Sequence, residues 1–266
     1  MKKIAVLGSN EKILDFIQGI VSGKKFFLRN FVISIEKTEE LQEHKILGLK
    51  TLTNHEAAIR NARIIILADD YFDLQKLSNY INFEKQILLN LSNCNSLKKK
   101  MLELPSKKTF NIALNPDLDN KESFVFASTI CEDKYVLNEV TEFLSVLGKV
   151  LYINEDQLES ASILNKCASA FIMRFVRSMS LAAVKLGFKG DLSNEIIIKI
   201  ASSSLKKLDK ENSHSETEID KLIASDLFLI DSLNELENNG FSFSILKGIE
   251  SAQRNRDKTS SSFLLN

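Results

Sequence analysis

The apolar residues of this chain change their spacing after Asn154. Before that residue, short β-branched runs such as Ile4–Leu7 and Ile64–Leu67 alternate with segments of helical spacing. From Glu155 to Leu186 the apolar residues recur only at helical spacing, and Gly187 stands where a helix would stop. This change predicts a sheet-containing part followed by a part made of helices alone.

The first part alternates strands with helices that are mostly entered through Ser, Thr, Asp or Asn. Such alternation with short connections is typical of βαβ crossovers, so we expect an α/β fold: an N-terminal Rossmann-like doubly wound sheet over residues 1–153 and an all-helical C-terminal domain over 154–266. The expected strands are 3–7, 31–35, 64–67, 86–89, 109–113, 123–127 and 150–153, and the expected helices between them are 11–21, 38–45, 53–60, 72–80, 94–101 and 133–146. Later helices are expected at 155–186, 191–208, 216–224, 227–238 and 242–256, with a polar connection at 209–216.

Composition excludes several classes of function. Lys+Arg and Asp+Glu both number 35, which gives a formal net charge of +0 and no basic patch for nucleic acid or membrane. The three cysteines share no metal-ligand spacing and the three histidines are scattered, so no metal site is expected. No stretch approaches the roughly 18 consecutive apolar residues of a membrane span, and the four apolar residues after Lys2-Lys3 are too few for a signal peptide. We therefore expect a cytoplasmic protein.

The first turn looks like a nucleotide-binding turn with altered residues. A strand ends at Gly8 and a helix starts near Asn10, where a dinucleotide fingerprint would have G-x-G-x-x-G. Asn10 and Ile13 stand at the second and third glycine positions, and Glu11 adds a negative charge that Lys12 partly offsets. Two interpretations stay open: a cofactor site with unusual residues, or a turn that only packs. On the first, the phosphate-binding residues are Gly8, Ser9, Asn10, Glu11 and Lys12.

The second half carries a resemblance to a known family. The chain has "FLSVLGKVLYINEDQLESAS" leading into a long helix, "AAVKLGF" at the end of that helix, and "LNELENNGF" before a last helix. In the length of the chain, the order of its parts and the spacing of these segments, it resembles pyrroline-5-carboxylate reductase. The resemblance implies NAD(P)H-dependent reduction of the cyclic imine 1-pyrroline-5-carboxylate to proline, with hydride passing to the imine carbon. It also implies a homo-oligomer, a dimer or higher, built through the helical domain.

The cofactor motifs of the family are altered in this chain. Where an acidic residue after the second strand would favour NAD and a basic one NADP, Glu36-Lys37 offers both, so the choice stays open. The family's A-V-K-P corresponds to Ala68-Asp69-Asp70-Tyr71, and these carboxylates either disfavour an anionic cofactor or cap the next helix. Because Gly8 and the amides of the first helix remain available, we expect weak binding of NADP or NAD rather than none.

The substrate motifs have changed as well. The family's G-S-G-P-A-Y corresponds to 166–171, and its S-P-G-G-T-T corresponds to 224–229, where glycines that would expose backbone amides to the substrate carboxylate are absent. Ser225 is expected as a helix N-cap, and Cys167 is either a small buried hydrophobe or a nucleophile activated by Lys166. The candidate substrate-binding residues are Cys167, Ala168, Ser169, Ser225 and Asp226, and no catalytic residue is assigned.

Three functions therefore stay open. The first is an imine reductase of this family that tolerates a divergent site. The second is a non-catalytic relative that serves as a dimeric scaffold or a ligand sensor, and the third is an oxidoreductase that acts on a different substrate.

Overall fold

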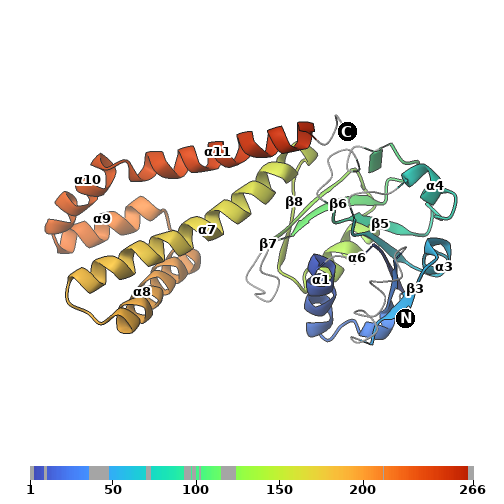
Figure 1. The fold of residues 1–266 in the computed structure, drawn as a ribbon, viewed down its shortest axis with the longest axis horizontal. Coiled ribbons are helices and arrows are strands. Elements are labelled where there is room, and N and C mark those ends of the chain that lie inside the picture. Colours follow the sequence, from blue (N-terminus) through green and yellow to red (C-terminus); the bar gives the residue numbers. More distant parts are fainter. Residues whose placement is uncertain are drawn as a thin grey trace. The chain divides into compact units, whose positions relative to one another are not determined.

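A computed structural model describes residues 3–8, 11–35, 48–69, 73–92, 97, 100, 101, 103–114, 124–211 and 213–262. Within these residues the chain divides into two compact units, Met1–Ser162 and Ile163–Asn266 (Figure 1). We call them the sheet unit and the helical unit. The helix expected at 38–45 lies outside the described residues.

The sheet unit is built on one eight-stranded sheet with the order β3-β2-β1-β4-β5-β6-β7-β8. All neighbouring pairs are parallel except β6 and β7, which are antiparallel. The seven expected strands are present, which confirms the doubly wound fold. The strands are β1 (Ile4–Leu7), β2 (Phe31–Ser34), β3 (Lys50–Leu52), β4 (Ile64–Leu67), β5 (Ile87–Asn90), β6 (Thr109–Leu114), β7 (Phe124–Thr129) and β8 (Lys149–Tyr152).

Strand β3 is the described strand that the sequence did not predict. It is three residues long and pairs with β2 at the edge of the sheet, from Val32↔Lys50 to Ser34↔Leu52. Its side chains are exposed or half-buried, so it shows no apolar pattern.

Helices cover both faces of the sheet because successive strand residues point to opposite sides. Ile4 and Val6 belong to one core with α1 and α6, whereas Ala5 and Leu7 belong to a second core with α3 and α4 (Figure 1). All four strand residues are completely buried, as expected for a strand covered on both faces. The helices are α1 (Glu11–Ser22), α3 (His55–Ile59), α4 (Leu74–Ser78) and α6 (Lys134–Leu144), with a short 3-10 turn, η1 (Leu28–Asn30), before β2.

Side-chain caps fix where three of these helices begin. Asn54 accepts a hydrogen bond from Ala57 N at the start of α3, and Asp133 accepts one from Tyr135 N at the start of α6. Helix α4 is capped by Asp73, which accepts from Lys76 N at 3.1 Å. The interpretation of Asp69-Asp70 as the cap of this helix is therefore wrong, because the helix begins at Leu74, five residues after Asp69.

Every described element after Tyr152 is a helix. The first of them ends as expected: Gly187 has φ +96°, and Phe188 N donates to Ala183 O at 3.2 Å. The expected polar connection at 209–216 is shorter than predicted, because α8 continues to Glu211 and α9 starts at Ser215. These helices are α7 (Glu155–Lys185), α8 (Gly190–Glu211), α9 (Ser215–Ser225), α10 (Phe228–Asn238) and α11 (Phe241–Ser262).

Inside the helical unit α11 packs closely on α7. A Cβ atom added to Gly248 would lie 2.7 Å from Phe171 Cζ, so glycine allows the two helices to approach. Phe175 of α7 meets Phe241 of α11 edge to face, with ring centroids 6.4 Å apart. These contacts hold one side of α7 within a single chain.

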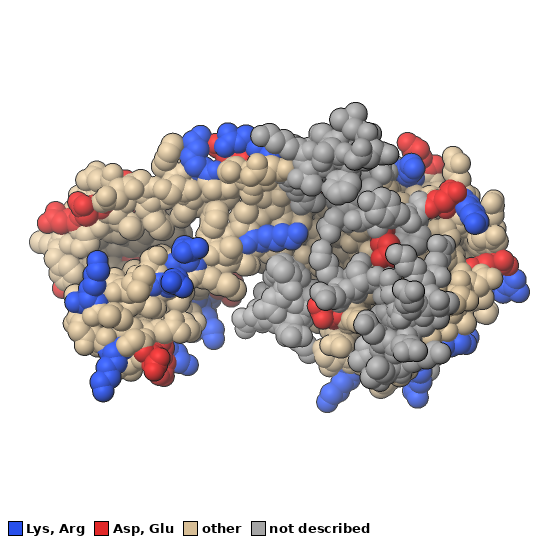
Figure 2. Space-filling view, in the orientation of Figure 1, with Lys and Arg blue, Asp and Glu red and all other residues tan. Residues whose placement is uncertain are grey.

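Much of the remaining surface of α7 is apolar and exposed. Met173 is 71% exposed and Leu181 58%. By length and composition alone α7 could span a membrane, and only 6% of its most apolar stretch is buried. The count of consecutive apolar residues missed this because Ser, Asn, Lys and Arg interrupt the runs. Figure 2 shows wide uncharged areas on the helical unit between scattered charged side chains. Such a surface marks a place for a partner.

Candidate functional site

The turn after β1 lies at the carboxyl edge of the sheet, where strand order reverses. Strand β1 pairs with β2 on one side and with β4 on the other, so the chain leaves the sheet in opposite directions here. Gly8 N donates to Ser34 O at 2.9 Å, and Ala68 N donates to Leu7 O at 2.9 Å. Gly8 has φ +91°, a conformation that favours glycine. Open α/β sheets bind their ligands at such a point.

Asp69 lies directly against this turn. A Cβ atom added to Gly8 would overlap the Asp69 carboxylate, and even the more distant oxygen, Oδ1, would be 2.8 Å away. The carboxylate therefore points toward the Gly8 turn and not away from it. Gly8 and Asp69, both predicted cofactor residues, are brought together with Ala68.

Ile13 has a structural role in α1. It is 2% exposed and belongs to the core between α1 and the sheet. Where the dinucleotide motif has a glycine for close packing, this chain fills the space with a side chain. Ser9 and Asn10 lie outside the described residues, as do the side chains of Glu11 and Lys12.

The end of β2 carries polar residues that the sequence reading missed. Glu36 and Lys37 lie outside the described residues. Ser34 is fully buried, and its Oγ lies 2.8 Å from His55 Nδ1 at the start of α3. A serine that ends the apolar run "FVIS" was the available signal for a polar group at this edge.

A second polar group joins β5, β6 and the first residue of α7. Asn90 Nδ2 donates to Asn111 Oδ1 at 2.8 Å, and Asn111 Nδ2 donates to Glu155 Oε2 at 3.0 Å. Asn90 and Asn111 are 0% and 2% exposed. Ser92, which follows β5, donates its backbone N–H to Asn90 Oδ1, and its hydroxyl is buried with no hydrogen-bond partner in the described part of the chain. Asparagines inside apolar strands were the signal that sequence reasoning passed over.

The first group of expected substrate residues lies on α7. Cys167, Ala168 and Ser169 are all half-buried, and Cys167 forms no disulfide. Ser169 Oγ donates to Asn165 O at 2.9 Å within the helix. Helical carbonyls and amides are paired along this segment, so its backbone does not present a ring of open amides as a glycine-rich turn would.

The second group lies at the junction of α9 and α10. Ser225 is the last residue of α9, and its Oγ donates to Leu222 O at 2.7 Å. The N-cap of α10 is Leu227, with no side-chain hydrogen bond. The expectation that Ser225 caps the following helix is wrong, because α9 runs through it and Asp226 ends that helix. The two groups of expected substrate residues therefore lie on different helices of the helical unit.

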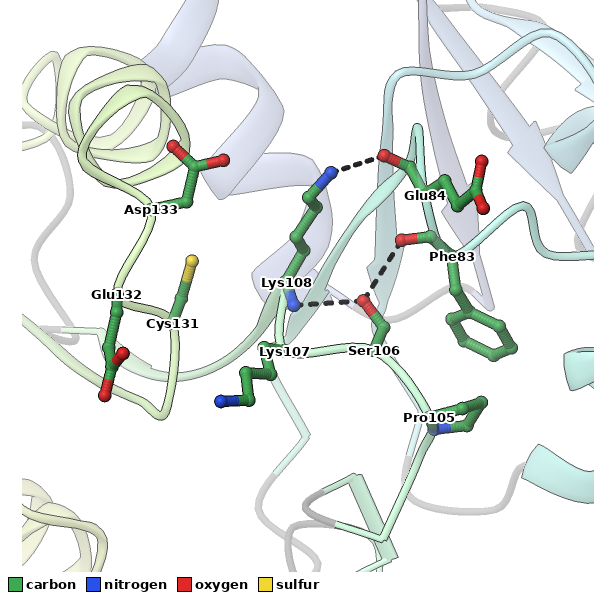
Figure 3. A pocket seen from close by; sticks show the side chains of 9 residues that line it. All are labelled: Phe83, Glu84, Pro105, Ser106, Lys107, Lys108, Cys131, Glu132 and Asp133. Atoms are coloured by element: carbon green, nitrogen blue, oxygen red, sulfur yellow. Dashed lines mark hydrogen bonds between the residues drawn. The ribbon is translucent and has the colours of Figure 1, made fainter.

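The structure also contains a hollow of about 350 Å³ at the opposite edge of the sheet (Figure 3). It lies where β6 begins and β7 ends, and its lining includes Lys107, Lys108 and Cys131. Lys108 Nζ donates to Glu84 O, while burial raises the pKa of the Cys131 thiol above its usual value. The amino edge is the wrong edge for a ligand in such a sheet, and the thiol is not activated. No cluster of metal ligands was found in the described residues.

Several known proteins are similar to this chain over most of its length. A family model described as pyrroline-5-carboxylate reductase dimerisation matches residues 155–259. Pyrroline-5-carboxylate reductase 2 of Dictyostelium discoideum is 26% identical over 269 residues, which cover 93% of this chain and 90% of the relative.

Two solved structures share the fold over nearly the whole chain. The Plasmodium falciparum pyrroline carboxylate reductase, solved with NADP bound, matches with a TM-score of 0.75 at 17% identity and covers 96% of each chain. A pyrroline-5-carboxylate reductase from Coxiella burnetii matches with a TM-score of 0.76 at 17% identity and covers 97% of this chain and 98% of its own. The chain is therefore similar to pyrroline-5-carboxylate reductases over nearly its whole length, and its residues 155–259 match the dimerisation model of that family.

Proposed function

We propose that the chain is an NAD(P)H-dependent oxidoreductase that reduces 1-pyrroline-5-carboxylate to proline. The observation that carries this proposal is the retention of the whole architecture of the family, from the Gly8 turn at the switch point to the helices matched by the dimerisation model. The bound cofactor would supply a hydride to the imine carbon. The work of the protein is to hold the cofactor, to orient the imine and to keep water away.

The Gly8 turn fits a dinucleotide in part. Its positive φ and its place at the carboxyl edge of β1 are what the phosphate turn needs, whereas the Asp69 carboxylate places a negative charge beside Gly8. A handicap of ~3 kcal/mol weakens affinity by about a hundredfold, so we propose weak binding of NADP or NAD and not its loss. The proposed cofactor residues are Gly8, Ser9, Asn10, Glu11, Lys12, Glu36, Lys37, Ala68 and Asp69.

For the substrate we propose Cys167, Ala168 and Ser169 of α7 together with Ser225 and Asp226. We propose that these residues act in a homo-oligomer, a dimer or higher, formed through the helical domain over 154–266. The exposed apolar side of α7 supports this, since a second copy would cover it. Cytoplasmic localisation stays part of the proposal.

Cofactor binding and turnover separate this proposal from its alternatives. Purified protein is titrated with NADPH and NADH by calorimetry, and the loss of reduced nicotinamide is then followed with 1-pyrroline-5-carboxylate. Binding with turnover is the expected result. Binding without turnover would favour a ligand sensor or an oxidoreductase that acts on a different substrate. No binding of either cofactor at millimolar concentration would favour the non-catalytic scaffold.

A glycine-restoring variant tests the phosphate turn. Asn10→Gly is expected to tighten NADPH binding because a side chain at the second glycine position blocks close approach of the pyrophosphate. Ile13→Gly is unsuitable for this test, because it would remove a side chain that is 2% exposed in the core. An unchanged affinity in Asn10→Gly would argue against phosphate binding at this turn.

A further inference from the structure

A chain of hydrogen bonds connects the end of β5 to the first turn of α7. Ser92 N donates to Asn90 Oδ1 at 3.0 Å, and Asn90 Nδ2 donates to Asn111 Oδ1 at 2.8 Å. Asn111 Nδ2 then donates to Glu155 Oε2 at 3.0 Å. Asn90 and Asn111 are opposite each other in the pairing of β5 with β6, and both are buried. The side chains of three residues thus join two strands and a helix.

The direction of every bond in this chain is fixed. A backbone N–H can only donate, so Ser92 requires Asn90 to present its side-chain oxygen and to turn its amide nitrogen toward Asn111. Asn111 must in turn accept with its oxygen and donate with its nitrogen. The last residue, Glu155, has to be an acceptor, and a carboxylate meets that need. Because a buried polar group that loses its partner is costly, each position depends on the next.

The contact made by Glu155 is separate from the local cap of α7. Gln157 Oε1 accepts from Asn154 N at 3.2 Å, which satisfies a backbone donor just before the helix. In the same turn Leu158 is completely buried. Apolar packing of Leu158 has no preferred direction, whereas the hydrogen bond from Asn111 has one. Together the two contacts determine how the first turn of α7 lies within the sheet unit.

We propose that Asn90, Asn111 and Glu155 are positioning residues that hold the first turn of α7 in one orientation beside the carboxyl end of β5. The inference rests on the proposed function and deepens it, because a doubly wound sheet binds its ligands at the carboxyl ends of its strands. The same helix carries the proposed substrate residues 167–169. Alignment of the reacting groups controls the rate of such a reaction, so movement of this turn should lower kcat.

Exchanging the donor and the acceptor at the last bond tests this chain specifically. Asn111→Asp keeps the size of the side chain but turns a carboxylate toward that of Glu155, so the bond is lost and the charges repel. Glu155→Gln alone keeps an oxygen that accepts from Asn111. In the double variant, Asn111→Asp with Glu155→Gln, the new carboxylate accepts from Asn90 and from the new amide, so the chain closes again at an unchanged net charge. Asp156→Asn is the matched control, because it removes a carboxylate of the same turn that takes no part in the chain.

The test is hydrogen–deuterium exchange of the whole chain and its four variants, read by mass spectrometry over residues 158–162, the part of α7 within the sheet unit. We expect exchange about tenfold faster in Asn111→Asp, and within about threefold of the wild type in Glu155→Gln, in the double variant and in Asp156→Asn. Exchange over β1 is the internal reference and should stay within about twofold. Turnover of 1-pyrroline-5-carboxylate with NADPH is then measured: kcat should fall about tenfold in Asn111→Asp and recover to within about threefold in the double variant.

The outcomes distinguish the two proposals. If Asn111→Asp exchanges as slowly as the wild type, if adding Glu155→Gln does not slow its exchange, or if kcat is unchanged, the positioning role is overturned. It is also overturned if β1 exchanges faster to the same extent, since the whole unit is then loosened, or if Asp156→Asn matches Asn111→Asp, since the effect is then one of charge in this turn. If exchange follows the expectation and no protein, the wild type included, reduces 1-pyrroline-5-carboxylate, the reductase proposal fails while the hold of the chain on α7 stands.

Discussion

The sheet unit buries the apolar residues of its central strand, whereas the helical unit leaves many apolar residues of α7 exposed. In the sheet unit the four residues Ile4–Leu7 are 0% exposed, because strands flank β1 on both sides and helices cover both faces. In the helical unit α7 is as apolar as a membrane span by composition, yet Met173 is 71% exposed. The first unit is complete in one chain, whereas the second needs a further surface to cover it.

The largest expected effect comes from phenylalanines that differ in burial. Phe143 of α6 is 1% exposed and contacts Phe26 edge to face at 5.1 Å, whereas Phe243 of α11 is 63% exposed. Phe143→Ala is expected to lower the free energy of unfolding of the sheet unit by about 3–5 kcal/mol. Phe243→Ala should cost less than about 1 kcal/mol. Urea unfolding of each variant measures both, and equal losses would show that the helical unit is as fully covered as the sheet unit.

Burial should also make the loss of one ion pair more destabilising than the loss of a second, exposed pair nearby. Arg63 donates to Glu139 from Nη2 at 2.5 Å and from Nε at 3.0 Å, and the Glu139 side chain is 4% exposed. Hydrogen bonding to Glu139 raises the pKa of Arg63. Arg63→Leu is expected to cost about 3 kcal/mol, because a buried carboxylate loses its guanidinium. Arg60→Leu is the control: its pair with Glu56 is exposed, so its loss should cost less than about 1 kcal/mol. Equal costs in denaturant unfolding would contradict the role of burial.

A carboxylate on the exposed side of α7 should weaken self-association. Ile172 and Met179 are 49% and 40% exposed and lie seven residues apart, on one side of the helix. The double variant Ile172→Asp with Met179→Asp is expected to raise the dimer Kd at least tenfold, about 1.4 kcal/mol, and to sediment toward the 30.0 kDa monomer. Ser178→Asp, on another side of α7, should leave the mass unchanged. A wild type that sediments as a monomer at every concentration would refute the need for a second copy.

The smallest effect is expected at an ion cluster of the helical unit in which a buried carboxylate, Glu218, pairs with two exposed lysines. Glu218 accepts hydrogen bonds from Lys207, Lys221 and Ser213, and these lower its pKa from 4.5 to about 2. Because the pKa in the folded state is below that in the unfolded state, the stabilisation is present above pH 4.5 and is lost as the pH falls toward 2. Glu218→Gln should therefore be less stable than wild type at neutral pH, and the difference should shrink across this window in acid unfolding. A difference that does not change with pH would exclude the carboxylate as its cause.

The elements that the sequence predicted are those with a local signal. The buried runs of β1 and β4 and the stop at Gly187 depend on neighbouring residues, and all were predicted. Strand β3 was missed because its three residues gain strand structure only by pairing with β2. Ser225 was wrongly assigned as the cap of the next helix because α9 continues to Ser225 instead of ending at residue 224. The position of a cap depends on where the helix ends, and that boundary is difficult to predict.

The candidate site was less predictable because its geometry is tertiary. The residues near Gly8 were predicted from the dinucleotide motif, but the direction in which the Asp69 carboxylate points depends on the pairing of β1 with β4. The hydrogen bonds of Asn90, Asn111 and Glu155 join residues that are 21 and 44 positions apart. Patterns of neighbouring residues cannot reveal contacts between residues so far apart in the sequence. The division of roles between residues 1–153 and 154–266 stays a prediction.

The buried side chain of Ile13 makes this position difficult to replace with glycine. Once a side chain fills the space between α1 and the sheet, its neighbours, including Phe16 and Ile17 in the same core, pack around its volume. Replacing Ile13 with glycine would leave a cavity in this core that only further substitutions could fill. A substitution at the half-buried Asp69 leaves no comparable cavity, so the turn tolerates change more readily there than at Ile13.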